Sequence, residues 1–365
     1  MMAEFDYEGR LGRLRRGMAE SGVDVVLLSV GSDLPYFAGY EAMPLERLTM
    51  LVVPAVGEAV LVVPELEAPR VQARPDVFAI KTFGENEDPV ALVADLARQP
   101  VTVAIGDHTW ARFLIGLQER LPHTRYLPAT PLTRTIRVVK EPGELGLLRL
   151  AAAAADRVVD RLRRMRFSGR SERELSALVR AMTVEEGHDL ATFHIVASGP
   201  NGASPHHEPG ERVMAPGDAV VVDFGGRLSG YCSDTTRTFH IGEPSTQVRE
   251  AYAVLAAAQE AGRRAVEPGV TAESIDRITR SLLTQAGFGR HFIHRTGHGI
   301  GLDGHEDPYI VEGNREQLLP GMAFSIEPGI YVPGRFGMRI EDIVVVTNDG
   351  VEEFNHSSRE LALVD

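Results

Sequence analysis

The first third of the chain alternates between short apolar runs and longer stretches in which apolar residues recur at helical spacing. Residues 7–21 place Leu11, Leu14 and Met18 on one face of a helix. Short apolar runs bounded by glycine, proline or polar residues are of strand length instead. The predicted strands are 23–29, 48–54, 58–64, 77–82 and 101–105, and the predicted helices are 7–21, 89–99 and 110–121, with a loop or helical turn at 33–40. This alternation predicts an α/β domain that ends near residue 135.

The rest of the chain mixes long helices with strands that carry acids. Pro142 and Gly143 punctuate the sequence shortly after residue 138, and a long helix is predicted to follow them. We therefore expect two domains, residues 1–138 and residues 139–365. The predicted helices of the second domain are 144–166, 171–186, 247–266 and 271–286. The combination predicts an α+β fold for this domain.

An acidic residue lies inside the strand-like run at residues 219–224. Asp223 follows three valines and precedes Phe224. Burying an uncompensated carboxylate costs several kcal/mol, so it should have a cation or a metal ion as its partner. Asp234 follows on a threonine-rich strand beyond a glycine-rich turn, and a hairpin could bring the two carboxylates face to face. Two carboxylates in contact repel each other unless a proton or a cation lies between them.

Two more apolar runs contain an acid in the same way. Residues 323–332 include Glu327, and residues 338–346 include Glu341. A single acid of this kind could point to solvent or pair with an arginine. Its recurrence in three runs of one half of the chain, together with Asp234, argues against that interpretation. Four converging carboxylates favour hard divalent cations.

A histidine motif supplies a fifth candidate ligand. Residues 294–302 read His-Arg-Thr-Gly-His-Gly-Ile-Gly-Leu, so His294 and His298 are four residues apart. This spacing could give a helical zinc pair, but the glutamate of that motif is missing and the three glycines argue against a helix. One histidine with four carboxylates favours Mn²⁺, Co²⁺ or Fe²⁺, and Zn²⁺ stays open.

The candidate ligands occur in the order of a known dinuclear metal site. They resemble the five ligands of the "pita-bread" metallopeptidases, which include methionine aminopeptidase, aminopeptidase P and prolidase: Asp223, Asp234, His298, Glu327 and Glu341. The flanking sequences Ser-Asp-Thr-Thr-Arg-Thr, Gly-His-Gly-Ile-Gly, Ile-Glu-Pro-Gly-Ile-Tyr and Arg-Ile-Glu-Asp match as well. The resemblance is strong over residues 140–365 and weaker over the N-terminal third. It implies an α/β N-terminal creatinase-like domain followed by an α+β pita-bread catalytic domain.

The resemblance also implies how the ligands share two divalent ions. Asp234 and Glu341 would bridge the ions, Asp223 would chelate one of them, and His298 and Glu327 would bind the other. Metal binding lowers the pKa of water from about 16 toward 7. Glu327 is then the candidate that carries the proton from this water to the leaving nitrogen.

Three histidines match positions that face the substrate in the family. His206 belongs to a Pro-His pair that precedes the first ligand strand, and its position favours it over His207. It would donate a hydrogen bond to the scissile carbonyl or the oxyanion. His294 and His305 flank the ligand histidine and would contact the substrate. The candidate catalytic residues are therefore His206, His305 and Glu327.

Arg339 and Tyr231 complete the implied substrate site. Arg339, two residues before a ligand, matches an arginine that holds the site or the substrate's carboxylate. Tyr231 matches a tyrosine of prolidase sites, although strand alternation would point it away from Asp234. The same alternation places Cys232 on the side of Asp234, and we expect this thiol to be packed in the core.

Charge and composition restrict the partners and the compartment. The formal net charge of −13 disfavours nucleic acid and anionic membranes as partners. The single cysteine excludes an intrachain disulfide and suits a reducing cytoplasm. Residues 1–17 lack an apolar signal core, and no apolar run approaches the roughly 20 residues of a membrane span. We therefore expect a cytoplasmic protein.

The resemblance therefore implies a dinuclear-metal hydrolase that cleaves Xaa-Pro bonds as an Xaa-Pro dipeptidase (prolidase). Cleavage of longer peptides, as in aminopeptidase P, stays open, and a non-enzymatic pita-bread binding protein is disfavoured because all five ligands are intact. The expected cofactors are two divalent ions, Mn²⁺ before Co²⁺, Zn²⁺ or Fe²⁺, and the expected substrate is a proline-containing dipeptide or peptide. The resemblance also implies a homodimer in which the N-terminal domain of one subunit helps to close the other subunit's site. Residues 36–47 are the most lid-like stretch of that domain, and an ordinary surface loop stays open as the alternative.

Overall fold

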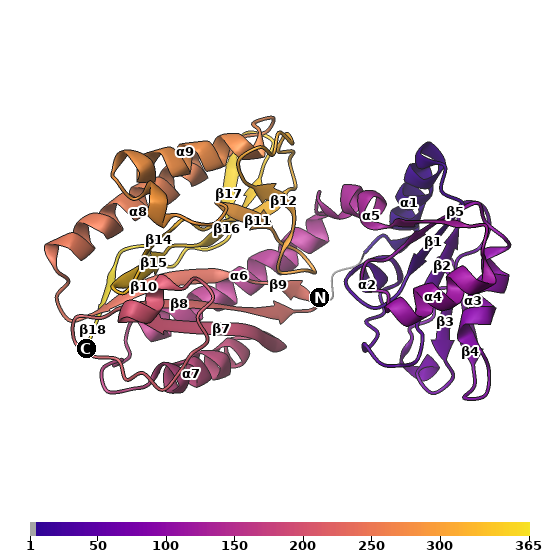
Figure 1. The fold of residues 1–365 in the computed structure, drawn as a ribbon, viewed down its shortest axis with the longest axis horizontal. Helices are drawn as coiled ribbons and strands as arrows, with labels where there is room; N and C mark the ends of the chain where they lie inside the picture. The colour runs from indigo at the N-terminus through magenta and orange to yellow at the C-terminus, as the bar shows by residue number, and fades with distance from the viewer. Residues whose placement is uncertain (1–4) are drawn as a thin grey trace. The chain divides into compact units, whose positions relative to one another are not determined.

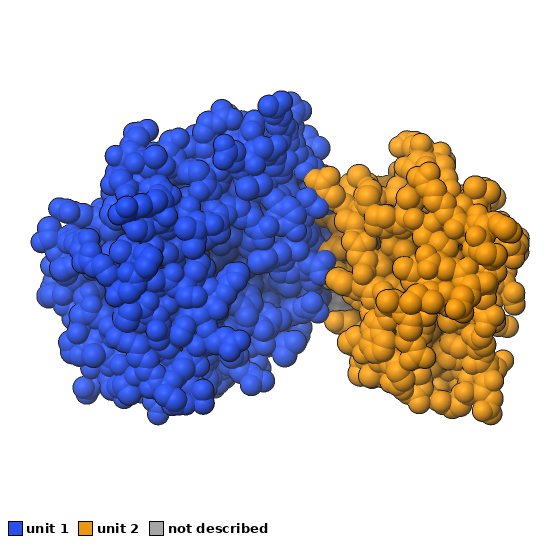
Figure 2. Space-filling view, viewed as in Figure 1, with its two compact units in different colours: residues 1–3, 138–365 blue, residues 4–137 orange. Residues whose placement is uncertain are grey.

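A computed structural model describes residues 5–365 of the 365-residue chain. The chain divides into two compact units, one that ends at Arg137 and one that begins at Val138 (Figure 2). No helix in this range is long and apolar enough to cross a membrane.

The N-terminal unit consists of one mixed sheet and the helices that pack on it (Figure 1). Its strands are β1 (Val25–Leu28), β2 (Met50–Pro54), β3 (Val60–Pro64), β4 (Ala79–Phe83), β5 (Thr102–Ile105) and β6 (Arg125–Pro128). Its helices are α1 (Tyr7–Ser21), α2 (Asp33–Ala38), α3 (Pro89–Ala97), α4 (Ala111–Arg120) and α5 (Thr130–Arg137), with a 3₁₀ turn η1 at Ala68–Arg70. The strand order is β4-β3-β2-β1-β5-β6. The expected α/β domain is confirmed.

The C-terminal unit carries two larger sheets and one hairpin. Its strands are β7 (Leu190–Ser198), β8 (Ala219–Leu228), β9 (Tyr231–Cys232), β10 (Thr235–Ile241), β11 (Gly297–Gly299), β12 (Glu306–Ile310), β13 (Ala323–Ile326), β14 (Gly329–Val332), β15 (Phe336–Arg339), β16 (Asp342–Val346), β17 (Val351–Glu353) and β18 (Ala362–Val364). One sheet has the order β18-β10-β8-β7 with β9 paired to β8, the second has the order β12-β11-β13-β16-β17, and β14 pairs with β15.

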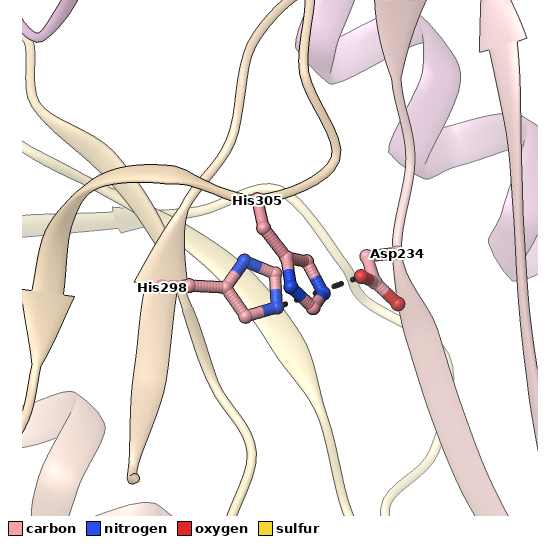
Figure 3. A group of neighbouring side chains, drawn as sticks. All are labelled: Asp234, His298 and His305. Carbon is pink, nitrogen blue, oxygen red and sulfur yellow. Dashed lines mark ion pairs between the residues drawn. The ribbon is translucent and has the colours of Figure 1, made fainter. Parts of the chain in front are cut away.

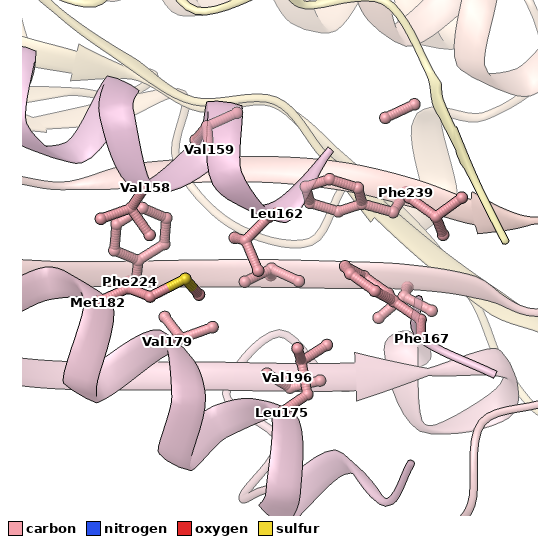
Figure 4. Packing of buried hydrophobic residues seen from close by; sticks show 14 of the residues in the cluster. Val158, Val159, Leu162, Phe167, Leu175, Val179, Met182, Val196, Phe224 and Phe239 are labelled. Atoms are coloured by element: carbon pink, nitrogen blue, oxygen red, sulfur yellow. The ribbon is translucent and has the colours of Figure 1, made fainter. Parts of the chain in front are cut away.

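Four long helices and two 3₁₀ turns accompany these strands. They are α6 (Pro142–Leu162), α7 (Glu172–Glu185), η2 (Gly199–Ala203), α8 (Thr246–Arg264), α9 (Ala272–Gln285) and η3 (Gly289–His291). Helices α6 and α7 cover one face of the first sheet, as Figures 1 and 4 show. Helix α9 packs on β13 and β16 of the second sheet, and α8 packs on β14 and β15. The expected α+β domain is confirmed.

Strand alternation decides which residues of β8 face the helices. Val220, Val222 and Phe224 belong to the apolar cluster that includes α6 and α7. Successive side chains of a strand point to opposite faces, so Asp223 points away from this cluster. The buried acid in the apolar run therefore lies on the sheet face that the helices do not cover.

Some elements differ from the sequence prediction. The run 338–346 was expected to be strand-like throughout, but Glu341 lies at a break between β15 and β16, and Glu327 lies just beyond the end of β13. At both breaks the chain passes from one sheet to another. Strands β6, β12 and β18 and helix α5 were not expected: each is short, and β6 and β12 include a proline.

Candidate metal centre

Three carboxylates meet where the first sheet approaches the β15–β16 break. Asp223, Asp234 and Glu341 each offer an oxygen, and these oxygens lie within 4.8 Å of one another. The β8–β10 pairing, which sets Thr236 opposite Asp223, brings the two aspartates to the same end of the hairpin. The backbone N–H of Glu341 donates to the carbonyl oxygen of Thr236 at 3.1 Å. Hydrogen bonding between distant segments thus gathers acids that are far apart in the sequence.

His298 enters the cluster from β11, where only glycine fits on either side of it. A Cβ atom at Gly297 would lie 1.8 Å from the carbonyl oxygen of Ser325, and one at Gly299 would lie 2.1 Å from that of Asp307. The strand is therefore pressed between its two neighbours. This close packing explains the Gly-His-Gly motif and confirms that the segment is not helical.

The protonation of His298 follows from its partners. Its Nδ1 lies 3.1 Å from the carbonyl oxygen of Gly299, which can only accept, so Nδ1 carries the hydrogen. Burial lowers the pKa of His298 to about 3, with a smaller contribution from His305. The imidazole is therefore neutral, and Nε2 presents a lone pair.

That lone pair faces carboxylate oxygens. Nε2 of His298 lies 3.2 Å from Glu327 Oε1 and 3.7 Å from Asp234 Oδ2. A lone pair and a carboxylate oxygen repel each other at such distances unless a proton or a cation lies between them. His298, Glu327 and Glu341 also form a group of ligand atoms within 4.8 Å of one another.

Burial and mutual repulsion raise the pKa values of three carboxylates in this cluster. Burial, followed by repulsion from neighbouring acids, raises the pKa of Asp234 and of Glu341 well above their usual values. Burial also raises the pKa of Glu327 to about 7. Within residues 5–365, Asp223 Oδ1 and Glu341 Oε1 are buried without a hydrogen-bond partner. Buried oxygens without donors suit hard divalent cations, so this donor set fits a metal centre.

His305 stacks beside His298, the candidate ligand histidine. The ring centroids of His298 and His305 are 3.8 Å apart, and both rings face Asp234 (Figure 3). Asp234, His298 and His305 form a third group of ligand atoms within 4.8 Å. His305 is exposed, whereas the other two residues are buried. It therefore lies at the rim of the centre, where an approaching substrate could reach it.

Arg339 donates hydrogen bonds to the candidate ligand Asp223 and to its neighbour Thr236. Its Nη2 donates to Asp223 Oδ2 at 2.5 Å, and its Nε donates to Thr236 Oγ1 at 3.1 Å. Thr236 Oγ1 in turn donates to Glu341 Oε2 at 2.7 Å. Arg339 therefore contacts the candidate ligand Asp223 directly and Glu341 through Thr236, and its expected contact with the substrate's carboxylate stays a prediction.

Tyr331 connects this arginine to His294, one of the histidines predicted to face the substrate. Arg339 Nη1 donates to the Tyr331 hydroxyl at 2.6 Å, and that hydroxyl lies 2.9 Å from His294 Nε2. His294 Nδ1 lies 2.7 Å from the carbonyl oxygen of Arg295 and so carries the hydrogen. Burial lowers the pKa of His294 to about 3, so its Nε2 accepts from Tyr331. Sequence reasoning missed Tyr331, although it ends the Ile-Glu-Pro-Gly-Ile-Tyr motif.

A second missed residue is Arg295, between the two histidines of the motif. Its guanidinium lies 4.3 Å from the ring centroid of Tyr309, and its Nη2 lies 3.2 Å from His305 Nδ1. Its charge is among the causes that lower the pKa of His298 and of His305, after burial. Its neighbour His294 was the more conspicuous residue in the sequence.

The loop histidines differ in their surroundings. His207 Nε2 lies 2.7 Å from Glu172 Oε2, whereas His206 is exposed. Charge interaction with His206 is a minor cause of the lowered pKa values of His294 and His305, so the three histidines lie within electrostatic range.

Tyr231 and Cys232 lie deeper in the protein. The Tyr231 hydroxyl donates to Glu144 Oε1 of α6 at 2.9 Å, and the side chain is buried. Its expected contact with the substrate stays a prediction. Cys232 is buried with its Sγ 3.5 Å from the carbonyl oxygen of Leu302, and burial raises its thiol pKa to about 11. Cys232 is thus a packed, protonated thiol, as expected.

The fold and the buried carboxylate–histidine centre define a pita-bread metallopeptidase. The family comparison agrees: residues 146–348 match the model of metallopeptidase family M24, and residues 10–139 match the creatinase/prolidase N-terminal domain. The chain belongs to metallopeptidase family M24 and is an enzyme, a peptidase.

Relatives extend this likeness over nearly the whole chain. A probable dipeptidase PepE from Mycobacterium tuberculosis is 45% identical over 363 residues, which cover 98% of this chain and 96% of the relative. An Xaa-Pro dipeptidase from Lactobacillus helveticus is 36% identical over 374 residues, with 97% and 98% covered. The crystal structure of dipeptidase PepE from Mycobacterium ulcerans matches with a TM-score of 0.93 at 43% identity, with 99% of each chain covered.

Proposed function

We propose that the chain is an Xaa-Pro dipeptidase that uses two divalent metal ions. The observation that carries the metal proposal is the set of buried acceptors without donors, above all the lone pair of His298 facing Glu327. The dipeptide substrate is supported by relatives that bear the names dipeptidase and Xaa-Pro dipeptidase.

The residues that would hold the ions are the five expected ligands: Asp223, Asp234, His298, Glu327 and Glu341. When bound, divalent cations supply Lewis-acid activation of water and of the scissile carbonyl. One imidazole with four carboxylates favours Mn²⁺, and Co²⁺, Zn²⁺ and Fe²⁺ suit the same donors.

The chain's own groups then orient the substrate and move the proton. Oε1 of Glu327 accepts a hydrogen bond from Ser325 Oγ at 3.2 Å, so we assign proton transfer to Oε2. The proline nitrogen lacks N–H and must gain this proton to leave. We assign His206 to donate a hydrogen bond to the developing oxyanion, and His294 and His305 to contact the substrate.

Hydrolysis of matched peptides tests the proposal. The protein is treated with chelator, supplied with Mn²⁺, and assayed with Ala-Pro and with Ala-Pro-Ala. A dipeptidase cleaves Ala-Pro with the higher kcat/KM. Preference for Ala-Pro-Ala would assign an aminopeptidase instead, and cleavage of neither peptide would contradict Xaa-Pro hydrolysis.

A further inference from the structure

His206 lies on a loop without helix or strand, so side-chain contacts must hold the loop in position. Beyond η2, residues 204–218 form no helix or strand before β8 begins. An exposed side chain on such a loop samples many positions, whereas an oxyanion donor must be held within about 0.5 Å of its working position.

A buried carboxylate lies beneath this loop. Glu172, the first residue of α7, is fully buried. Its Oε1 accepts from the Ser198 backbone N–H at 2.8 Å and from Ser198 Oγ at 2.7 Å. Its Oε2 accepts from His207 Nε2 at 2.7 Å and from the Gly210 N–H at 3.3 Å, and Asn201 Nδ2 reaches both oxygens at 3.1 and 3.2 Å. One side chain thus ties together the beginning, middle and far part of the loop.

The charge state of Glu172 makes these bonds strong. Burial alone would raise its pKa, but the bonds from Ser198, His207 and Asn201 outweigh burial, and the pKa is lowered. An ionised carboxylate only accepts, so Nε2 of His207 carries the hydrogen of the 2.7 Å bond. Hydrogen bonds to a charged group are about twice as strong as neutral ones.

The opposite side of the loop rests on a strand of the centre. A Cβ atom at Gly337 would lie 1.6 Å from the Gly202 carbonyl oxygen, so β15 and the loop are in backbone contact. Nη2 of Arg339, at the end of β15, approaches the Pro205 carbonyl oxygen at 3.5 Å. His206 is therefore placed between Pro205 and His207, each of which is held by a different part of the unit.

We propose that Glu172 is a positioning residue that holds His206 in place through its hydrogen bond to His207. This inference rests on the proposed function, because it requires His206 to act on the substrate. The hydrogen bonds of Glu172 and His207 among the described residues go to the loop and to Ser198 rather than to the candidate metal ligands, so their contribution passes through the loop.

A double-mutant cycle tests this coupling. His207→Ala, His206→Ala and the double variant are assayed with Ala-Pro in the Mn²⁺-loaded protein, and metal content is measured for each. We expect His206→Ala to lower kcat by about 10²–10³-fold. We expect His207→Ala to lower kcat about tenfold, less than the roughly 10²-fold cost of a 1 Å misplacement, with metal content unchanged. In the His206→Ala background, His207→Ala should have no further effect.

Two more variants separate positioning from general stability. His207→Gln should recover most of the lost kcat, because its amide N–H₂ can donate to Glu172 as Nε2 does. Arg173→Ala, which removes a neighbouring ion pair with Glu211 between exposed side chains, should leave kcat unchanged.

The possible failures are distinguishable. If His206→Ala left kcat unchanged, the assigned role of His206 and this inference would both be wrong. If His206→Ala lowered kcat but His207→Ala did not, or if the two effects multiplied in the double variant, only the positioning role would be overturned.

Discussion

Removing one buried carboxylate should stabilise the metal-free enzyme. Burial, with repulsion from Asp223, raises the pKa of Glu327 from 4.5 to about 7. The difference of about 2.5, at 1.36 kcal/mol per pKa unit, corresponds to about 3 kcal/mol. Because the pKa of Glu327 is raised in the folded state, the carboxyl group costs the wild-type protein no stability at pH below 4.5. The cost of about 3 kcal/mol develops as the pH rises from 4.5 to about 7. At pH 8 the free energy of unfolding of Glu327→Gln should therefore be about 3 kcal/mol higher than that of the wild type.

The assay is urea unfolding of chelated protein at pH 5 and pH 8. Circular dichroism follows both units, whereas fluorescence of the single tryptophan, Trp110, follows the N-terminal unit. A transition that appears in circular dichroism but not in fluorescence therefore reports the unfolding of the C-terminal unit. We expect the advantage of Glu327→Gln at pH 8 to shrink below about 1 kcal/mol at pH 5. Saturating Mn²⁺ should reverse the order at pH 8, because the variant lacks one anionic ligand.

A control variant with the opposite sign completes the experiment. Arg149 lowers the pKa of Glu352, so Glu352→Gln should not stabilise the metal-free protein at pH 8. If Glu327→Gln gave no stabilisation at pH 8, or the same gain at both pH values, the assignment of Glu327 to a repulsive, cation-binding cluster would be wrong.

Further predictions concern the ligands, the core and the assembly. Asp234→Ala and Glu341→Ala should abolish activity and reduce bound metal while the circular dichroism spectrum is retained; full turnover with two bound ions would refute their bridging role. Asp342→Ala should destabilise the unit by about 3–5 kcal/mol in urea unfolding, because it leaves the buried guanidinium of Arg237 without its carboxylate partner; a loss below 1 kcal/mol would contradict this. Light scattering should show a homodimer at assay concentration, and an active monomer would exclude residues 36–47 as a lid on the partner's site.

The sequence shows the candidate ligands because a buried charge is conspicuous among apolar neighbours. Asp223 follows three valines and faces away from the core cluster, and Glu327 and Glu341 stand at the ends of apolar strands. The exact strand bounds were not visible, because both glutamates lie where the chain changes sheets. The apolar residues around each acid identify it as a candidate ligand, whereas the pairing of strands in the folded sheets decides where each strand ends.

Residues whose partners are distant in the chain do not stand out from their neighbours in the sequence. Tyr331 is 37 positions from His294 in the chain, and Glu172 is 35 positions from His207. Alone, each is an ordinary tyrosine in a strand or an ordinary acid in the first turn of a helix. Their roles depend on hydrogen bonds that only the folded unit creates.

Anomalous diffraction from crystals soaked in Mn²⁺ tests the central claim most directly. We expect two manganese peaks, and the side chains in contact with them should be those of Asp223, Asp234, His298, Glu327 and Glu341. Active crystals in which this cluster holds no manganese, or in which the peaks lie elsewhere, would contradict a dinuclear metal centre at these residues.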